Sequence, residues 1–429
     1  MYLSNKEKEA QAWEWGEYVE KGTIEEQNRI VDEWVERRNK HIGEIIIPRV
    51  GEHPASLDNF YGSQTNEWVT TDLIRRYAEA MGDRNPMWRS QDYARKSVWG
   101  GMIAQPTILD SIAQPVPGAN EPEQWKKFNS WVRWPSEHNY ELYRPIRPGD
   151  RIHLVQKFLG ILEEECSEPA PTRQFADVNR IWFINQREET VGHVTYVRRA
   201  WVNRPGGEHG VPRNPYDKDN RIRRRLTDEE RDAIYAGYDN EWRRGNEPFY
   251  WEDVSVGDEA KPLVVGPISL YDTAATYSAL GGHAVGFATQ WDRMKLDVTF
   301  GYLDDEVNAY KSGGECHFAD RKGHAQLYGG GYATAQAQTI YGARCHAICN
   351  WMGDNGFVRS FKNYLTTITL LGDVLDTRIK VIKKYTDGDA CLVDLDVKTY
   401  NQDNILLVDG SATVQLPTRN QYGIHEFRL

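Results

Sequence analysis

The chain has 429 residues, of which 40% are hydrophobic and 27% charged, and this length predicts two or three soluble domains of about 100–200 residues each. The net charge of −11 argues against nucleic-acid binding, which needs a clustered basic surface. No run approaches the roughly 18 consecutive apolar residues of a membrane span.

The N-terminus and the cysteines bear on the compartment. The segment MYLSNKEKEAQAWEW lacks the apolar core of a signal peptide. The five cysteines are odd in number and widely scattered, so they do not form a disulfide framework. We therefore expect a reduced, cytoplasmic protein.

Residues 1–44 predict a helical appendage. Charged residues fill this stretch, and tryptophans and aliphatic residues recur in it at roughly helical spacing. Gly22 interrupts the pattern, after which Thr23 and Glu26 have the spacing of a capping box that opens a second helix.

Residues 45–203 predict a first domain of mixed structure. The run TTDLIRRYAEAMGD places Leu73, Ile74, Tyr77 and Met81 on one helical face. The later runs RIHLVQKFLGIL, ADVNRIWFINQ and GHVTYVRRAWV are rich in β-branched and aromatic residues, which favours strands.

Residues 204–246 have a different composition. They are rich in Gly and Pro at first and then charged, with a short helical pattern in LTDEERDAIYAGY, so we interpret them as a linker. The basic cluster that includes Arg223–Arg225 could meet an anionic ligand, or it could be a solvated face or an interdomain ion pair.

Residues 247–429 repeat the first order of elements. The run SLYDTAATYSALGGH corresponds to TTDLIRRYAEAMGD, and aligning Tyr77 with Tyr277, 200 positions later, places Asp83 on His283. Strand-like runs again follow the helix. The chain is therefore predicted to be an internal duplication of two α+β halves, each a helix wrapped by a curved antiparallel sheet.

The motif GDRNPMWRSQDYARKSVWGGMIAQPT, from Gly82 to Thr107, resembles the signature of the MaoC-like dehydratases. With YWEDVSVGDE and NWMGDNGFVRSF in the second half, the chain resembles fused acyl dehydratases whose N-terminal half is like that of type I fatty-acid synthase. The resemblance implies a double hot-dog fold, in which two helix-in-sheet halves share one continuous sheet.

The same resemblance implies an activity. Members hydrate trans-2-enoyl thioesters or dehydrate (R)-3-hydroxyacyl thioesters, on coenzyme A or an acyl carrier protein. An Asp and a His five positions later hold one water between them, and backbone N–H groups at a helix start polarise the thioester carbonyl. Such chemistry needs a base, an acid and donors for the enolate-like oxygen.

The first half departs from this pattern at one position. Asp83, Asn85 and Pro86 are kept, but Trp88 stands where the histidine is expected. Tryptophan cannot act as a base. We therefore expect this half to be non-catalytic, with Asp83 structuring its loop and Trp88 forming a pocket wall or part of the core.

The second half departs in another way. His283 stands at the position of the motif Asp, a long insertion follows it, and His317 with Asp320 resembles the H-x-x-D end of the motif displaced by that insertion. We predict that His283 and His317 divide the base and acid roles near neutrality. The alternative is that each is an ordinary structural or surface histidine, and His324 is a weaker candidate.

Substrate contacts are expected from two segments. In AQTIYGARCHAICNWMGDNG, Gly342 and Ala343 could present N–H groups to a thioester carbonyl, and Tyr341 and Arg344 could meet the substrate. Arg344 could also hold a carboxylate or a coenzyme phosphate. The matched residues in the first half are Gly100 and Gly101, with Trp88 as a further pocket residue. Packing roles remain the alternative.

Other chemistries have little support. Cys345, His346 and Cys349 lie close together, but no second Cys/His pair at zinc spacing accompanies them, so no metal is expected. The phosphate loop and the G-x-S-x-G nucleophile elbow are both missing from the sequence. We expect no cofactor other than coenzyme A as part of the substrate.

The leading hypothesis is a hydratase or dehydratase of acyl thioesters with one working site in the second half. A hot-dog thioesterase that recruits Asp272 or Glu315, and a catalytically silent acyl-binding or partner subunit, are the alternatives. The aromatic content, with 15 Trp and 23 Tyr, mildly favours a bulky acyl group. A homodimer or a complex with another hot-dog subunit is expected, because hot-dog sheets often pair.

Overall fold

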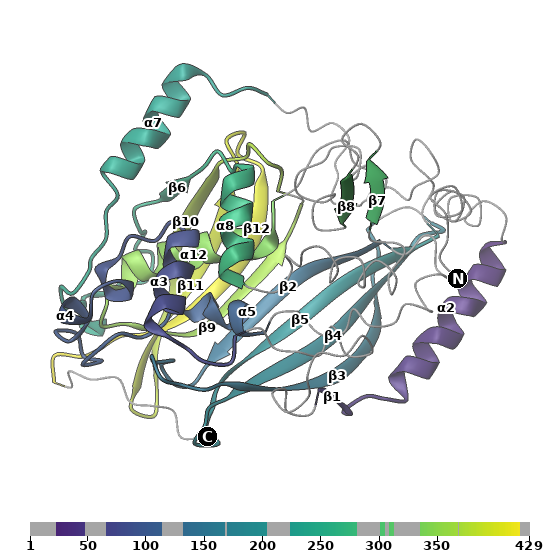
Figure 1. The fold of residues 1–429 in the computed structure, drawn as a ribbon, viewed down its shortest axis with the longest axis horizontal. Helices are drawn as coiled ribbons and strands as arrows, with labels where there is room; N and C mark the ends of the chain where they lie inside the picture. The colour runs from purple at the N-terminus through teal and green to yellow at the C-terminus, as the bar shows by residue number, and fades with distance from the viewer. Residues whose placement is uncertain are drawn as a thin grey trace.

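One ten-stranded antiparallel sheet forms the centre of the protein in the computed structural model (Figure 1). The structure describes residues 23–47, 66–113, 132–167, 170–203, 224–280, 301–304, 309–312, 335–367 and 369–420. The strand order in the sheet is β1-β3-β4-β5-β2-β9-β12-β11-β10-β6.

The first five strands belong to the first half of the chain and the last five to the second. They are β1 (Ile45–Ile47), β3 (His153–Glu164), β4 (Arg173–Ile184), β5 (Thr190–Val202), β2 (Val132–Leu142), β9 (Phe357–Leu365), β12 (Leu406–Gln415), β11 (Ala390–Tyr400), β10 (Leu375–Asp387) and β6 (Leu263–Val265). Read outward from the β2–β9 pair, the order of the second half mirrors that of the first. The mirrored topology confirms the expected α+β double hot-dog fold, with one sheet shared by two similar halves.

Alternating burial explains why the strands form one sheet with a covered face. Along β3, buried and partly exposed side chains alternate, which is the period of a half-buried strand. At the junction of the halves, Tyr140 of β2 pairs with Phe361 of β9, and the two buried rings stack with centroids 5.9 Å apart. Buried aromatic pairs of this kind stabilise the junction beyond the area that they bury.

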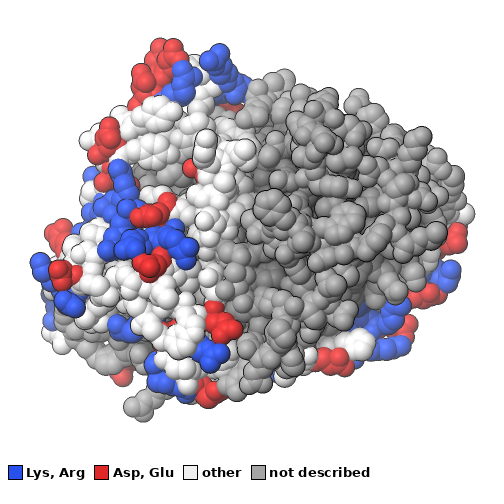
Figure 2. Space-filling view, in the orientation of Figure 1, with Lys and Arg blue, Asp and Glu red and all other residues white. Residues whose placement is uncertain are grey.

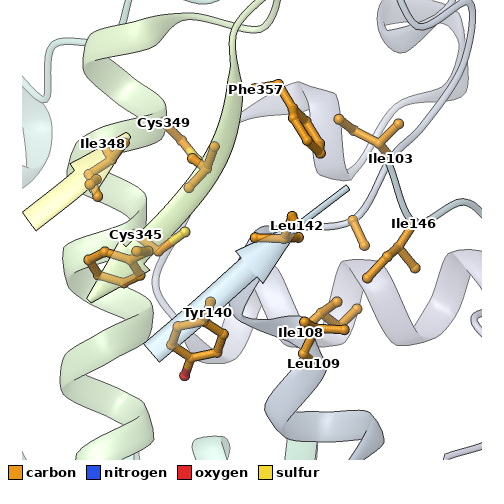
Figure 3. Packing of buried hydrophobic residues seen from close by; sticks show 14 of the residues in the cluster. Ile103, Ile108, Leu109, Tyr140, Leu142, Ile146, Cys345, Ile348, Cys349 and Phe357 are labelled. Carbon is orange, nitrogen blue, oxygen red and sulfur yellow. The ribbon is translucent and has the colours of Figure 1, made fainter. Parts of the chain in front are cut away.

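Helices cover the buried face of the sheet. They are α3 (Thr71–Ala80), η2 (Pro86–Trp88), α4 (Gln91–Ala94), η3 (Pro106–Ile108), α5 (Leu109–Ile112), α8 (Leu270–Leu280) and α12 (Ala337–Met352). Every residue of α12 is buried. Figure 3 shows Cys345, Ile348 and Cys349 of α12 in the same cluster as Tyr140 and Leu142 of β2, so the two halves share one core.

Two helices lie outside this layer. Thr23 caps α2 (Ile24–Asn39) by accepting the N–H of Glu26, as the sequence predicted, and α2 packs its Trp34 with Phe158 and Phe175 of the first half. Residues 1–22 of the predicted appendage lie outside the described residues.

The second outlying helix is α7 (Asp228–Asp239), which begins with a capping box between Thr227 and Glu230. It forms part of the segment predicted as a linker, and Ile234 packs with Leu226 and Val374 of the second half. No helix in the described part of the chain is long and apolar enough to cross a membrane. In Figure 2 the described Lys and Arg side chains are intermixed with Asp and Glu.

Element boundaries differ slightly from the predictions. The helix predicted through Asp83 ends at Ala80, because the chain turns at Gly82, whose φ of +69° is in the left-handed region that glycine adopts without strain. Within the predicted insertion, β7 (Gly301–Asp304) and β8 (Ala309–Ser312) form a separate two-stranded sheet. A short helix, η5 (Trp251–Asp253), precedes β6.

Candidate active site

The loop after α3 positions the motif carboxylate. The N–H of Asp83 donates to the carbonyl of Ala78 at 2.9 Å, which turns the chain back on the end of the helix. The Asn85 side chain then caps η2 by accepting the N–H of Met87 at 2.9 Å, and Pro86 occupies the first position of η2. These turns carry Asp83 into the interior, where its side chain is fully buried.

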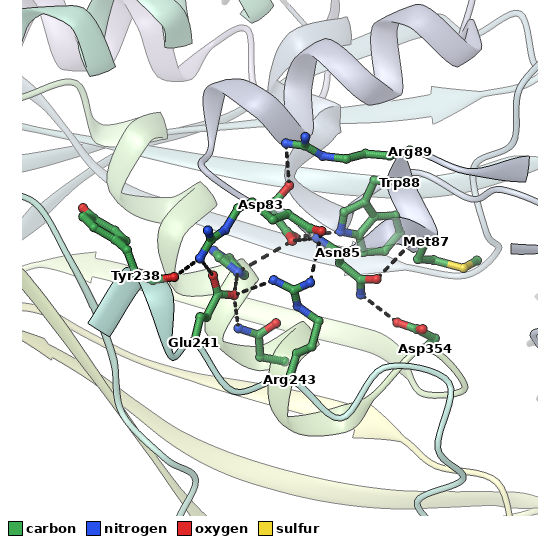
Figure 4. Close-up of polar contacts among 12 residues, drawn as sticks. Asp83, Asn85, Met87, Trp88, Arg89, Tyr238, Glu241, Arg243 and Asp354 are labelled. Atoms are coloured by element: carbon green, nitrogen blue, oxygen red, sulfur yellow. Dashed lines mark hydrogen bonds and ion pairs between the residues drawn. The ribbon is translucent and has the colours of Figure 1, made fainter. Parts of the chain in front are cut away.

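Three donors hold the Asp83 carboxylate. Oδ1 accepts the backbone N–H of Asn85 at 2.9 Å, and Oδ2 accepts the indole N–H of Trp88 at 2.7 Å (Figure 4). Oδ2 also accepts the side-chain amide of Gln105, which precedes η3. Asp83 therefore holds its own loop through the N–H of Asn85, and Trp88 donates a hydrogen bond at the position where the motif resemblance implies a histidine.

A histidine from the other half lies beside this carboxylate. His346, in the interior of α12, has its Nε2 3.6 Å from Oδ1 of Asp83 and 2.7 Å from Oε1 of Glu241. The imidazole is 1% exposed. Its Nδ1 has no hydrogen-bond partner among the residues that the structure describes. A buried carboxylate–imidazole pair is thus assembled from one residue of each half.

Glu241 comes from the chain between the halves. It lies just after α7, its side chain is 6% exposed, and its Oε1 also accepts the amide of Asn350 at 2.9 Å. Burial alone would raise the pKa of Glu241, but the hydrogen bond from His346 and the charges of His346 and Arg243 lower it well below its usual range. Glu241 is therefore ionised across the neutral range.

The same pair of carboxylates acts on His346. Burial alone would lower the pKa of its imidazole, but the negative charge of Asp83, with the hydrogen bond and charge of Glu241, raises the pKa above its ordinary value of 6.5. A shift in this direction keeps the ring partly protonated near neutrality, where a group can both accept and return a proton.

A second carboxylate ties the motif loop to the end of α12. Asp354 accepts the amide of Asn85 at 2.7 Å and the hydroxyl of Tyr93 at 2.7 Å. Burial raises the pKa of Asp354, and burial together with the bond to Asp354 raises that of Tyr93 to about 12. Asn85 and Asp354 are 269 residues apart in sequence, so this contact joins the halves at the site.

Arg344 lies away from this cluster. Its buried guanidinium donates to Asn363, to Thr399 and to the carbonyls of Val397 and Val408, all of them neutral acceptors in the sheet. Burial lowers its pKa to about 9. Through these hydrogen bonds Arg344 links α12 to the sheet. None of the four acceptors belongs to the Asp83 cluster.

The predicted donors Gly342 and Ala343 lie inside α12, not at its start. Because the helix begins at Ala337, their N–H groups bond to carbonyls one turn back, so the expectation that they donate to a thioester carbonyl is wrong. Gly342 instead gives space to Met81, whose side chain a Cβ at this position would overlap. Tyr341 is fully buried, with its ring 5.0 Å from that of His138.

Gly100 and Gly101 lie in the loop before η3, where Gly100 has a φ of +65° and open space around it. Gly342 and Ala343 are helical, so the two matched segments differ in local structure. The predicted catalytic pair, His283 and His317, lies outside the described residues.

Sequence reasoning did not identify His346 and Glu241 as site residues. His346 could have been found as a titratable residue in a segment made mostly of small and apolar residues. In the sequence analysis it was considered only together with Cys345 and Cys349, as a possible metal ligand. Among the described residues, no three His, Cys, Asp or Glu side chains are arranged to hold a metal ion. Nothing in the sequence distinguishes Glu241 from the other charged residues of its segment.

Sequence comparison finds a similarity to one family model within the first half. Residues 59–193 match the family model described as the FAS1-like dehydratase domain region. This match covers part of the first half of the chain and shows a similarity to that family. A UPF0336 protein of Streptomyces avermitilis is 27% identical over 95 residues, and one of Streptomyces coelicolor is 30% identical over 95 residues. Each match covers 22% of this chain and 62% of the relative, so the chain spans less than two thirds of these curated relatives.

Structural comparison extends the similarity beyond the FAS1-like region. A solved MaoC-like dehydratase superposes with a TM-score of 0.53 at 17% identity, covering 84% of this chain and 100% of the other. Over that 84% the chain therefore shares the fold of a MaoC-like dehydratase, in agreement with the double hot-dog fold expected from the motif at Gly82–Thr107.

Proposed function

We propose that this protein is a hydratase or dehydratase of acyl thioesters, in which His346 exchanges the proton and Asp83 stabilises its charged form. The observation that carries the proposal is the approach of these two residues to 3.6 Å inside a FAS1-like dehydratase fold. Trp88 occupies the motif position at which a histidine is expected. The imidazole beside Asp83 is that of His346, from the second half.

The reaction follows from this pair. In the hydration direction, a ring nitrogen of neutral His346 takes a proton from water as the water oxygen bonds to the β-carbon, and the electron pair of the double bond moves to the thioester as an enolate. The resulting imidazolium, stabilised by Asp83, returns a proton to the α-carbon. Dehydration is the reverse, so atoms and charge balance with no co-reactant.

Two buried polar atoms at the site support this assignment. Nδ1 of His346 and Oε1 of Gln105 have no partner among the described residues. Since buried polar atoms are normally hydrogen-bonded, such atoms are candidates to hold a water or a substrate group.

The test follows the enoyl-thioester absorbance with crotonyl-CoA and with longer and aromatic acyl-CoAs. His346→Gln and Asp83→Asn should each lower turnover by roughly 10²–10⁴-fold, the usual contribution of a general acid–base group. His41→Gln, at an exposed histidine paired with Glu44, is the matched control and should leave turnover unchanged.

Three other outcomes contradict the proposal. Release of free thiol would indicate a thioesterase. Of the two carboxylates considered for that role, Asp272 is exposed and bonded to Ser269, and Glu315 lies outside the described residues. No turnover with any acyl group would indicate a silent acyl-binding subunit. Loss of activity in His317→Ala but not in His346→Gln would return the chemistry to the displaced motif.

A further inference from the structure

We infer that Glu241 is a positioning residue that fixes the tautomer of His346, so that Nδ1, and not Nε2, is the nitrogen that exchanges the proton. The inference rests on the proposed function, because the proton exchange is a catalytic step only if the protein is a hydratase or dehydratase. It also makes the chain between the halves part of the active site.

The contact with Glu241 determines which nitrogen of the His346 ring carries the hydrogen. An ionised carboxylate can only accept, so the short contact of 2.7 Å between Oε1 and Nε2 requires the hydrogen on Nε2. In the neutral imidazole the other nitrogen then carries the free lone pair. That atom, Nδ1, is buried and has no partner among the described residues.

Glu241 is itself held in place. Its Oε1 accepts the amide of Asn350 at 2.9 Å, one turn along α12 from His346, and its Oε2 is 3.3 Å from the guanidinium of Arg84. With these partners the carboxylate is fixed between α12 and the motif loop, which is what a group that orients another side chain requires.

The backbone near Glu241 is anchored to the same helix. The N–H of Arg244 donates to the carbonyl of Asn350 at 3.1 Å, and the N–H of Asp354 donates to the carbonyl of Gly245 at 2.8 Å. The end of the segment predicted as a plain linker, at Arg244 and Gly245, is therefore attached to the C-terminal end of α12, which holds the backbone three residues after Glu241.

Three charged groups act on the imidazole. Asp83 faces it from the motif loop, and Glu241 and Arg243 face it from the segment between the halves. Its nearest titratable neighbours on α12 are Cys345 and Cys349. Two carboxylates against one guanidinium leave a net negative surrounding, so removing the charge of Glu241 should make the imidazolium less stable.

The experiment measures the ring directly. In the full-length protein labelled with ¹⁵N-histidine, the His346 signals are assigned by their loss in His346→Gln. In the wild type we expect hydrogen on Nε2 in the neutral form and a titration midpoint above 6.5, the ordinary value. In Glu241→Gln, whose amide can donate as well as accept, the midpoint should fall and the preference for hydrogen on Nε2 should weaken.

Activity provides the second measurement. Glu241→Gln should lower kcat by about 10–100-fold, the usual effect of losing a carboxylate that orients a histidine, with little change in KM. The limb of the pH profile that reports His346 should move to lower pH, which a loss of packing alone would not cause. Glu247→Gln, at an exposed glutamate directly after that segment, should match the wild type in both measurements.

The outcomes are distinguishable. Hydrogen on Nδ1 in the wild type, or an unchanged tautomer and midpoint in Glu241→Gln, would overturn the inference even if the enzyme is active. The expected ring signals in a protein that turns over no thioester would support the positioning by Glu241 and refute the proposed function. The wild-type tautomer decides the first point even if Glu241→Gln does not fold.

Discussion

At the scale of single residues, Trp88 occupies a motif position and contacts the motif aspartate, but its indole cannot serve as a general base. Its indole N–H donates to the Asp83 carboxylate at 2.7 Å, and its side chain is 3% exposed. The sequence correctly indicated that this position cannot exchange protons. It gave no sign that a histidine from the other half lies near the same carboxylate, because that approach depends on how the halves pack.

This contact predicts the effect of a substitution. Trp88→Phe leaves a buried carboxylate short of one donor, and because hydrogen bonds to charged groups contribute about 1.5–3 kcal/mol, the free energy of unfolding in urea should fall by about that amount. Trp99→Phe is the matched control: the indole of Trp99 donates to a neutral acceptor, the carbonyl of Asp354 at 2.8 Å, so about 0.5–1.5 kcal/mol is expected. Equal losses would mean that the charge of Asp83 does not contribute.

At the scale of elements, α12 illustrates which features of the sequence were informative. Its small residues were interpreted as a segment that allows close approach, which is correct for Gly342, but the approaching group is Met81 and not a substrate. The small residues of α12 indicate that another part of the chain packs closely against this helix. They do not identify that neighbour as Met81, since α3 and α12 belong to different halves.

The same substitution in two helices tests this reading. Gly342→Ala and Gly237→Ala share the gain in helix propensity, about 1 kcal/mol, but only the first meets a neighbour, with Cγ of Met81 2.7 Å from the added Cβ. Gly237 in α7 has nothing within 4 Å of that position. Because overpacking a core costs about 1–3 kcal/mol, Gly342→Ala should be less stable than Gly237→Ala by about that amount in urea unfolding. A pair of equally stable variants would contradict the packing described for α12.

At the scale of the whole molecule, the duplication could be predicted and the site could not. Matching Tyr77 with Tyr277 was enough to expect two similar halves, because hydrophobic periodicity and turn residues are local signals. The cluster of Asp83, Glu241 and His346 draws on the motif loop, the segment between the halves and α12. No local pattern links three segments so far apart, so only the packed structure brings them together.

Since this cluster joins the halves, it should make stability depend on pH. The pKa of His346 is raised on folding, so its contribution is present below its ordinary value of 6.5 and is lost as pH rises through the raised pKa. The pKa of Glu241 is lowered, so its contribution is present above 4.5 and is lost as pH falls through the lowered pKa. Both contributions are complete only between pH 4.5 and 6.5.

Comparison with His346→Gln isolates the cluster from other titrating groups. We expect the difference in free energy of unfolding between wild type and this variant to be largest between pH 4.5 and 6.5 and to shrink on both sides. Urea unfolding at pH values inside this window, below it and above it measures the difference. His41→Gln, which removes an exposed histidine, should follow the wild type throughout. A difference that stays constant with pH would show that His346 contributes by packing alone and that its charge does not couple the two halves.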